Sequence, residues 1–352
     1  MNPALAPLFT PLRLNAALTL RNRIALAPCT RNRATEDMSP TPGAATHYAS
    51  RADAGLLITE GTIVAKQVQG YIETPGIFLD SHVRAWAKVT DTVHQRGGTI
   101  FLQLWHTGRM AHSYWNGGTQ PLGASAVLDP GPRRQTRGLQ LHHEMPRAMT
   151  GAEVREAIGH YRAAAARAKD AGFDGIEIHG ANGYLPEQFL RLHTNKRTDE
   201  WGGSAANRAR LGIAVVDACA EGIGAERVGL RLSPAAYFSE MRYTPGDNDA
   251  LLELLSALRS RPIAYIHTGI VDDLPYDYLD GTSTEYLRRH WNGVLIGNGA
   301  YSPKQAAAQI AKGGFDLIAW GRIFLANPDL LTRLRDGTPL ADYSRALLDD
   351  LT

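Results

Sequence analysis

Eight short, β-branched runs alternate with amphipathic helical patterns, and this alternation constrains the fold of the chain most strongly. Each run ends in Gly, Pro or a polar residue, as buried strands commonly do. The runs span residues 23–28, 56–61, 99–106, 175–180, 228–233, 263–269, 293–299 and 317–322. Helical patterns lie between most of them, for example at residues 151–172, 207–222 and 302–314. Because strands that alternate with helices pair in parallel, eight repeats predict an α/β fold, the (β/α)₈ TIM barrel.

Two segments stand outside this repeat. Residues 8–23 look like a hairpin across the barrel floor, and residues 107–149, which follow the third strand, are too long for a plain connecting loop. Functional groups in such barrels gather at the C-terminal ends of the strands, so we expect the insertion at 107–149 to cap the site. No linker-like segment divides the chain, and we interpret residues 1–352 as a single TIM-barrel domain.

The charge, cysteine and hydropathy patterns argue against several classes of protein. The 37 Lys and Arg residues nearly balance the 35 Asp and Glu residues without any basic run, so we expect no nucleic-acid partner. Cys29 and Cys219 lie far apart and outside any metal-ligand spacing, so we expect no metal site. No window approaches the roughly 18 apolar residues of a membrane span, and prolines interrupt the N-terminus where a signal peptide is apolar. We therefore expect a cytoplasmic protein with no membrane partner.

A polar triad follows the fourth strand. The alternation of residues 176–179 is typical of a strand, and two glycines then mark a loop that carries His179, Asn182 and Tyr184. The His and Asn groups can polarise a carbonyl or nitro oxygen, while the phenol can deliver a proton. A loop that only satisfies its own hydrogen bonds has the same pattern, so the triad by itself leaves both interpretations open.

Other strands also place polar groups where a barrel is normally apolar. The period-2 pattern directs Gln103 into the barrel mouth and Arg231 into the interior, where a guanidinium needs either a structural carboxylate or an anionic ligand. The last two strands end in the glycine-containing segments 297–302 and 321–324, just before helices. Together with the cation Arg322, these segments predict a phosphate site for a phosphorylated cofactor or substrate.

Nine motifs occur in an order that resembles the Old Yellow Enzyme family of FMN-dependent ene-reductases. They are LAPCTRNRA (26–34), EGT (60–62), QGYIETPG (69–76), LQLWHTGRM (102–110), HGANGYLPEQFL (179–190), TNKRTDEWGGS (194–204), ANRARL (206–211), VGLRLSP (228–234) and GRIFLANPDL (321–330). The resemblance extends from about Leu8 to Leu331. It implies a TIM barrel with FMN across its mouth and with NADPH or NADH as the reductant.

The resemblance also implies roles for individual residues. The positions expected around the FMN ring are Pro28, Thr30, Gly61, Gln103 and Arg231, and those near its phosphate are Asn298, Gly299, Gly321 and Arg322. His179 and Asn182 match the pair that holds the electron-withdrawing group of the substrate, and Tyr184 matches the residue that protonates the α-carbon. The expected pocket-lining positions are Tyr71, Trp105 and Phe238. For Tyr71 and Phe238 a simple core role stays open.

These implications predict an FMN-dependent NADPH dehydrogenase, or ene-reductase, that acts on small-molecule enone or nitro substrates. Hydride would pass from flavin N5 to the β-carbon of the alkene, and nitrate esters form a further substrate class. Thr30 and Tyr71 match the branch of nitro-ester and enone reductases, whereas the C-terminal PLADYSRALLDDLT (339–352) lacks the aromatic tail of many members. The sequence therefore leaves open what forms the roof of the pocket, how large a substrate fits, and whether the protein is a monomer or a homodimer.

Two alternatives accompany this prediction. A flavin-binding sensor would keep the FMN positions but turn over little substrate. A phosphate-binding barrel aldolase or isomerase would need a Lys or an acidic base at a strand end, and none of the eight predicted strands contains Lys. The intact His179, Asn182 and Tyr184 set favours the reductase over the sensor.

Overall fold

The computed structural model describes residues 2–133 and 138–348 of the chain. Met1, residues 134–137 of the predicted insertion and residues 349–352 of the C-terminal segment, all inside the predicted 1–352 domain, lie outside the described residues.

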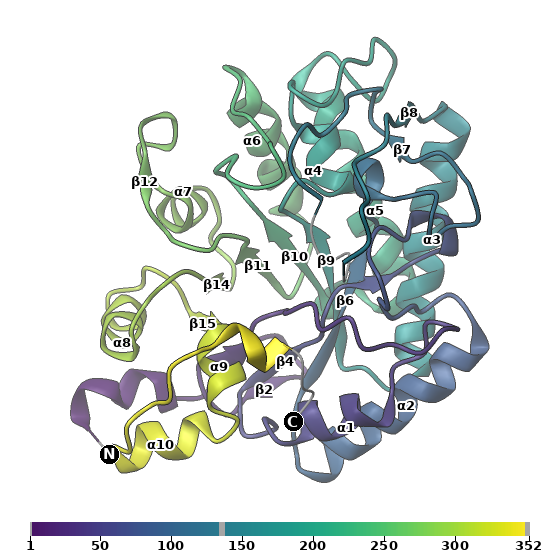
Figure 1. Ribbon diagram of the computed structural model, residues 1–352. Coiled ribbons are helices and arrows are strands. Elements are labelled where there is room, and N and C mark those ends of the chain that lie inside the picture. Colours follow the sequence, from purple (N-terminus) through teal and green to yellow (C-terminus); the bar gives the residue numbers. More distant parts are fainter. Residues whose placement is uncertain (1, 134–137, 349–352) are drawn as a thin grey trace.

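In the described chain, eight parallel strands close into a barrel (Figure 1). They are β3 (Ile24–Leu26), β4 (Leu56–Ile58), β6 (Ile100–Trp105), β9 (Gly175–Gly180), β10 (Val228–Leu232), β11 (Tyr265–Thr268), β14 (Leu295–Gly297) and β15 (Leu317–Trp320). The pairings of β15 with β3 and of β4 with β6 complete the circle, and the short β5 (Thr62–Ile63) extends the edge of β6. Each of the eight barrel strands falls within one of the eight predicted runs, so the predicted TIM barrel is confirmed.

Helices surround the barrel because their apolar faces pack against the outer faces of the strands. They are α1 (Pro42–Ala49), α2 (Asp80–Gln95), α3 (Gly151–Asp170), α4 (Leu185–Leu190), α5 (Ala205–Ile223), α6 (Asp247–Leu258), α7 (Ser283–His290), α8 (Pro303–Ala311), α9 (Arg322–Ala326) and α10 (Leu330–Asp336). The start of α3 shows how the sequence sets these boundaries. Thr150 and Glu153 cap each other's backbone N–H groups there, which satisfies donors that a helix end leaves free.

The barrel floor is closed by the N-terminal hairpin of β1 (Leu12–Arg13) and β2 (Thr19–Leu20). Its leucines form one apolar cluster with inward side chains of the barrel such as Phe101 and Tyr265. Leu102 and Leu104, on the opposite face of β6, belong to the outer core instead. The predicted floor hairpin and the predicted alternation along β6 are both confirmed.

Shorter elements connect these parts. The 3-10 helices are η1 (Pro3–Phe9), η2 (Lys66–Val68), η3 (Gly108–Met110), η4 (Ala225–Arg227), η5 (Asp277–Leu279) and η6 (Arg345–Leu348). The insertion after β6 contains η3 and the pair β7 (Leu122–Gly123) and β8 (Arg147–Ala148), and β12 (Pro275–Tyr276) pairs with β13 (Gly281–Thr282). Among the described residues, no helix combines the length and the apolarity that crossing a membrane requires.

The end of the described chain returns to the barrel mouth. Arg31, in the loop after β3, donates from Nη2 to the carbonyl of Leu347 at 2.9 Å. Arg33 donates in the same way to the carbonyl of Leu348 at 3.1 Å. The described C-terminal segment is thus held beside the loop that carries Thr30, and its Tyr343 lines neither of the two pockets described below.

Candidate active site

A layer of polar side chains replaces the apolar packing in the upper part of the barrel. Glu177 lies on the inward face of β9 and accepts a hydrogen bond of 2.7 Å from Nε2 of Gln103, which lies on β6. Its other carboxylate oxygen lies 2.8 Å from Nδ1 of His267 on β11. Burial opposes ionisation of this carboxyl, but His267, Arg231 and Gln103 together hold the pKa of Glu177 below its ordinary value. Glu177 is therefore a buried anion at the centre of the barrel.

Arg231 stands next to this layer, between His179 and His267 in the strand register. Its side chain is buried, and its Nε has no hydrogen-bond partner among the described residues. Arg231 is near enough to lower the pKa of Glu177, yet the hydrogen bonds of this carboxylate are to Gln103 and His267 and not to Arg231. The guanidinium thus retains the capacity to bind an anionic or electron-rich ligand group.

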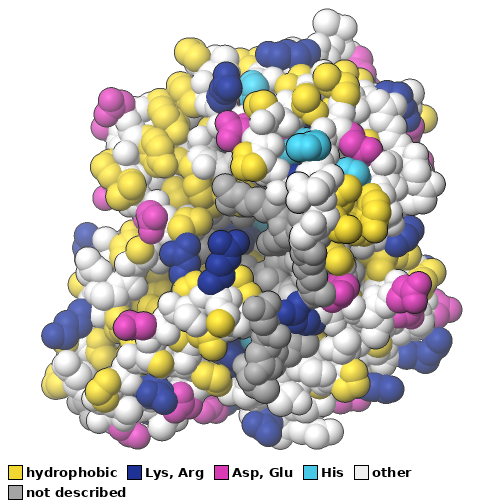
Figure 2. All heavy atoms as spheres, in the orientation of Figure 1, with side chains coloured by type: hydrophobic (Ala, Val, Ile, Leu, Met, Phe, Trp, Pro, Cys, Tyr) yellow, Lys and Arg dark blue, Asp and Glu magenta, His cyan; other side chains and the backbone are white. Residues whose placement is uncertain are grey.

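A cavity of about 500 Å³ opens beside Arg231 at the C-terminal ends of β3, β14 and β15. Six of the nine predicted cofactor positions line it, namely Pro28, Arg231, Asn298, Gly299, Gly321 and Arg322. The face of the molecule seen in Figure 2 is hollowed near its centre, with Lys and Arg side chains at the margin. Most of the sequence positions predicted for one cofactor therefore lie around one cavity.

The cavity wall suits a ligand with a phosphate end. A Cβ atom on Gly321 would lie 2.7 Å from Sγ of Cys29, and Gly299 has a φ of +141°, which side chains rarely permit. These glycines leave backbone exposed to a ligand, and the exposed Arg322 adds a cation at the same edge. With Arg231 at the other end, whose Nε has no hydrogen-bond partner in the described part of the chain, the residues present fit FMN.

Three predicted ring contacts lie outside this cavity lining: Thr30, Gly61 and Gln103. Thr30 is half-buried two residues beyond Pro28, and Gln103 is held in the polar layer below. At Gly61 a Cβ atom would lie 2.5 Å from the ring of Trp105, so glycine is required there by the packing of that indole. Packing against Trp105 thus explains why glycine occupies position 61, and the sequence alone did not indicate this reason.

The triad residues come together at the end of β9. The ring centroids of His179 and Tyr184 are 4.8 Å apart, and Trp105 stacks near the imidazole at 6.2 Å. Burial, followed by the influence of Arg231 and His267, lowers the pKa of His179 well below its ordinary value. The imidazole is therefore neutral near pH 7, with one nitrogen that donates and one that accepts. Its Nδ1 has no hydrogen-bond partner among the described residues.

Asn182 is held by its neighbours in a left-handed conformation, with a φ of +59°. Its backbone N–H donates to Oγ of Ser233, whose own proton is directed at the carbonyl of Gly269, 2.6 Å away. The Tyr237 hydroxyl donates to Oδ1 of Asn182 at 2.7 Å. Since the amide oxygen is engaged in this way, the Nδ2 group is left to donate to a ligand.

Tyr184 precedes α4 and is buried against the other aromatic residues of the site. Its hydroxyl lies 3.1 Å from that of Tyr71, which stacks on Trp105 with centroids 5.1 Å apart. Burial, followed by Tyr71, raises the pKa of Tyr184 well above its ordinary value, so the phenol keeps its proton at physiological pH. Tyr184 can therefore act as a proton donor but not as a phenolate.

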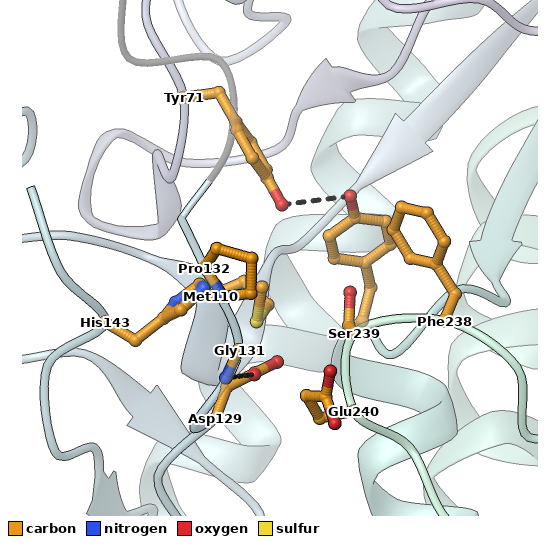
Figure 3. A pocket seen from close by; sticks show the side chains of 10 residues that line it. Tyr71, Met110, Asp129, Gly131, Pro132, His143, Phe238, Ser239 and Glu240 are labelled. Carbon is orange, nitrogen blue, oxygen red and sulfur yellow. Dashed lines mark hydrogen bonds between the residues drawn. The ribbon is translucent and has the colours of Figure 1, made fainter.

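The insertion covers these aromatic residues. A small pocket of about 70 Å³ is lined by Tyr71, Tyr184 and Phe238 together with insertion residues such as Asp129 and His143. Figure 3 shows Tyr71 pointing into this space. The described part of the insertion thus lies where the sequence predicted a cap. Tyr71 belongs to both the core and the pocket wall, whereas the half-buried Phe238 lines the pocket without belonging to the core.

Several residues of the site were not predicted from the sequence. Glu177 and His267 carried a signal, because each lies at an inward position of an alternating strand. Tyr237 and Arg133 carried none, since both lie in irregular segments. The guanidinium carbon of Arg133 lies 5.8 Å from the centroid of the Tyr71 ring, which places a cation of the insertion over the aromatic cluster.

Comparison with known proteins agrees with this geometry. The model of a family described as NADH:flavin oxidoreductase / NADH oxidase matches residues 7–341. The chain is 37% identical to 12-oxophytodienoate reductase 2 from Arabidopsis thaliana, over 97% of this chain and 91% of that protein. A solved structure of the Old Yellow Enzyme homologue from Zymomonas mobilis is similar, with 36% identity, a TM-score of 0.89 and coverage of 97% and 96%. Morphinone reductase in complex with tetrahydroNAD gives 39% identity, a TM-score of 0.88 and coverage of 97% and 93%.

Proposed function

The chain belongs to the Old Yellow Enzyme family of FMN-dependent NADH:flavin oxidoreductases, and on this basis we propose that it is an ene-reductase for α,β-unsaturated carbonyl and nitro compounds. A nicotinamide, NADPH or NADH, is the reductant. Nitrate esters are a further substrate class for the same site. The relatives named for reduction of 12-oxophytodienoate and morphinone support the assignment to small organic substrates.

The cofactor site is assigned to the cavity beside Arg231. The residues that we assign to it are Pro28, Thr30, Gly61, Gln103, Arg231, Asn298, Gly299, Gly321 and Arg322. The chemistry that bound FMN supplies there is hydride transfer, from the nicotinamide and then to the β-carbon of the alkene. Arg231 stabilises negative charge near the ring, and Arg322 with the neighbouring backbone holds the phosphate.

His179 and Asn182 bind the carbonyl or nitro oxygen of the substrate. Both are uncharged donors, His179 buried and Asn182 half-buried with its amide held by Tyr237, so they hold the oxygen and stabilise the negative charge that grows on it during reduction. Withdrawal of electron density through this oxygen makes the β-carbon a better hydride acceptor. The pair therefore orients the substrate and lowers the barrier at the same time.

Tyr184 delivers the proton that completes the reaction at the α-carbon. Its buried phenol remains protonated, and its hydrogen bond with Tyr71 offers a route by which a proton can be replaced after transfer. Hydride at one carbon and a proton at the other convert the alkene to the saturated product, while the nicotinamide is oxidised.

The observation that carries this proposal is the pairing of a neutral, buried His179 with a protonated Tyr184, their ring centroids 4.8 Å apart. In the strand register His179 is the partner of Arg231, which lines the cavity. The test is to identify the released chromophore by mass and to measure oxidation of NADPH and NADH that depends on 2-cyclohexenone or a nitroalkene. We expect FMN and the saturated product. Bound FMN with no product from any alkene would support the flavin-binding sensor instead.

A further inference from the structure

Glu177 has no place in the reaction described above, although it is the fully buried carboxylate at the centre of the polar layer. It connects two groups on different strands, Nε2 of Gln103 at 2.7 Å and Nδ1 of His267 at 2.8 Å. Arg231 lies on the adjacent strand β10, two residues beyond Gly229, which is the partner of Glu177 in the strand register, and its Nε lacks a hydrogen-bond partner among the described residues. A buried anion of this kind is costly to keep and so points to a role beyond packing.

The chemistry of an ionised carboxylate determines how Gln103 is oriented. A carboxylate only accepts hydrogen bonds, so the amide nitrogen of Gln103 must face Glu177 and its Oε1 must face elsewhere. If an amide replaced the carboxylate, that constraint would disappear, because an amide both donates and accepts. The side chain of Gln103 could then rotate between its two amide orientations.

The charge of Glu177 also acts on Arg231. In a buried site with low effective dielectric, neighbouring charges interact strongly, and Arg231 contributes to the low pKa of Glu177. The interaction is mutual, so the carboxylate weakens the positive potential that Arg231 presents to the cavity.

We propose that Glu177 is a positioning residue that fixes the carboxamide of Gln103 for the FMN ring and, by offsetting the charge of Arg231, holds down the reduction potential of the bound flavin. This inference rests on the proposed function, because it presumes FMN in the cavity. Its two parts act through different neighbours. Gln103 determines cofactor affinity, whereas Arg231 determines how far the site favours the more negative, reduced cofactor.

The test compares the midpoint potential and the FMN dissociation constant of the holoprotein with those of Glu177→Gln. Loss of the buried negative charge should increase the equilibrium constant for flavin reduction at least tenfold, which is about 30 mV for a two-electron couple. FMN affinity should fall because Gln103 loses its fixed orientation. Asp247→Asn is the matched control, since it removes an equally buried carboxylate that pairs with Arg191 and Arg208 instead. The potential of this control should not change.

A second variant separates the two parts. Glu177→Asp keeps the charge but withdraws the carboxylate from Gln103, so it should retain the potential and lose FMN affinity. An unchanged potential in FMN-loaded Glu177→Gln, or, if that variant does not fold, unchanged FMN affinity in Glu177→Asp, would overturn the proposal. A wild-type protein that binds no FMN would instead overturn the proposed function.

Discussion

The hydroxyl oxygens of Tyr71 and Tyr184 lie 3.1 Å apart in the wall of the covered pocket. The two tyrosines come from distant segments, one from the loop after η2 and one from the loop between β9 and α4, and the barrel brings them together. Only one phenol proton can lie between the two oxygens, and when Tyr71 supplies it the proton of Tyr184 can point at a substrate. This pairing makes Tyr184 a proton donor with a second phenol behind it.

Tyr184→Phe should impair enone reduction far more than nitroalkene reduction. An enone needs the proton at its α-carbon, whereas the anion left by hydride addition to a nitroalkene is already stabilised by the nitro group. General acid catalysis is worth on the order of a hundredfold to ten-thousandfold, and we expect a loss of kcat of that size for 2-cyclohexenone. Tyr71→Phe should cost less, since it leaves the donor in place. Equal losses for both substrate classes in Tyr184→Phe would rule out this role.

Replacement of both His179 and Asn182 by Ala should abolish tight binding of phenols, which place an oxygen anion where the substrate oxygen would lie. Loss of two such hydrogen bonds corresponds to roughly a hundredfold weaker binding. The measurement is a titration of the holoprotein with a phenol, followed by the change in the visible spectrum. His142→Ala, on the exposed surface of the insertion, serves as the control. Unchanged phenol affinity in the double variant would contradict the assignment.

Tyr237→Phe should weaken phenol binding about fivefold, because a hydrogen bond of about 1 kcal/mol to Oδ1 of Asn182 is lost and the amide is held less firmly. FMN affinity should stay the same, since Tyr237 is not among the residues assigned to the cofactor. Tyr243→Phe is the matched control, because its ring stacks on Tyr278 at 3.9 Å without a role at Asn182. A phenol dissociation constant that does not change in Tyr237→Phe would show that other neighbours orient the amide.

The stability of the protein should depend on pH through Glu60. Burial raises the pKa of Glu60 from 4.5 to about 7, although Arg31 and Asn32 donate backbone hydrogen bonds to it. The folded state therefore holds this proton more tightly than the unfolded chain, and the stabilisation, roughly 3 kcal/mol, is present below the unfolded pKa and lost as pH rises through about 7. Glu60→Gln should flatten the fall in the free energy of unfolding between about pH 5 and about pH 8.

The matched control has the opposite sign. This control is Glu153, which accepts a hydrogen bond from Arg147 that lowers its pKa from 4.5 to about 2. The stability that Glu153 contributes is therefore present above pH 4.5 and lost as the pH falls toward 2. Glu153→Gln should leave the fall above pH 5 unchanged. If the free energy of unfolding of Glu60→Gln fell with pH as steeply as that of the wild-type protein, the carboxyl of Glu60 would not be the cause of the fall. Denaturant unfolding curves at several pH values provide the measurement.

The sequence was sufficient for the strands and for the direction of their side chains. Each predicted run contains a barrel strand because hydrophobic alternation and strand-end glycines are local signals, and the same alternation placed Gln103 and Arg231 inside. Glu177 and His267 were missed although the pattern puts them on the inner face, because their partners lie on other strands. Pairing across strands follows from barrel closure, which single-strand patterns do not contain.

The loops over the site were beyond prediction for another reason. The contact of Tyr237 with Asn182 depends on the path of the segment after β10, which includes left-handed backbone at Ser239 and Glu240. Neither residue type favours that conformation strongly, so tertiary packing imposes it and local propensity gives no signal. The position of Arg133 over Tyr71 likewise follows from the fold of the insertion.

The most direct test of the account is an anaerobic titration of the purified protein in which the visible flavin band is followed as NADPH or NADH, and then 2-cyclohexenone, is added. Reduction of the cofactor by the nicotinamide should bleach the band, and the enone should restore it with one equivalent of saturated ketone. A colourless protein, or a band that bleaches and does not recover with any enone or nitroalkene, would contradict the assignment of an ene-reductase.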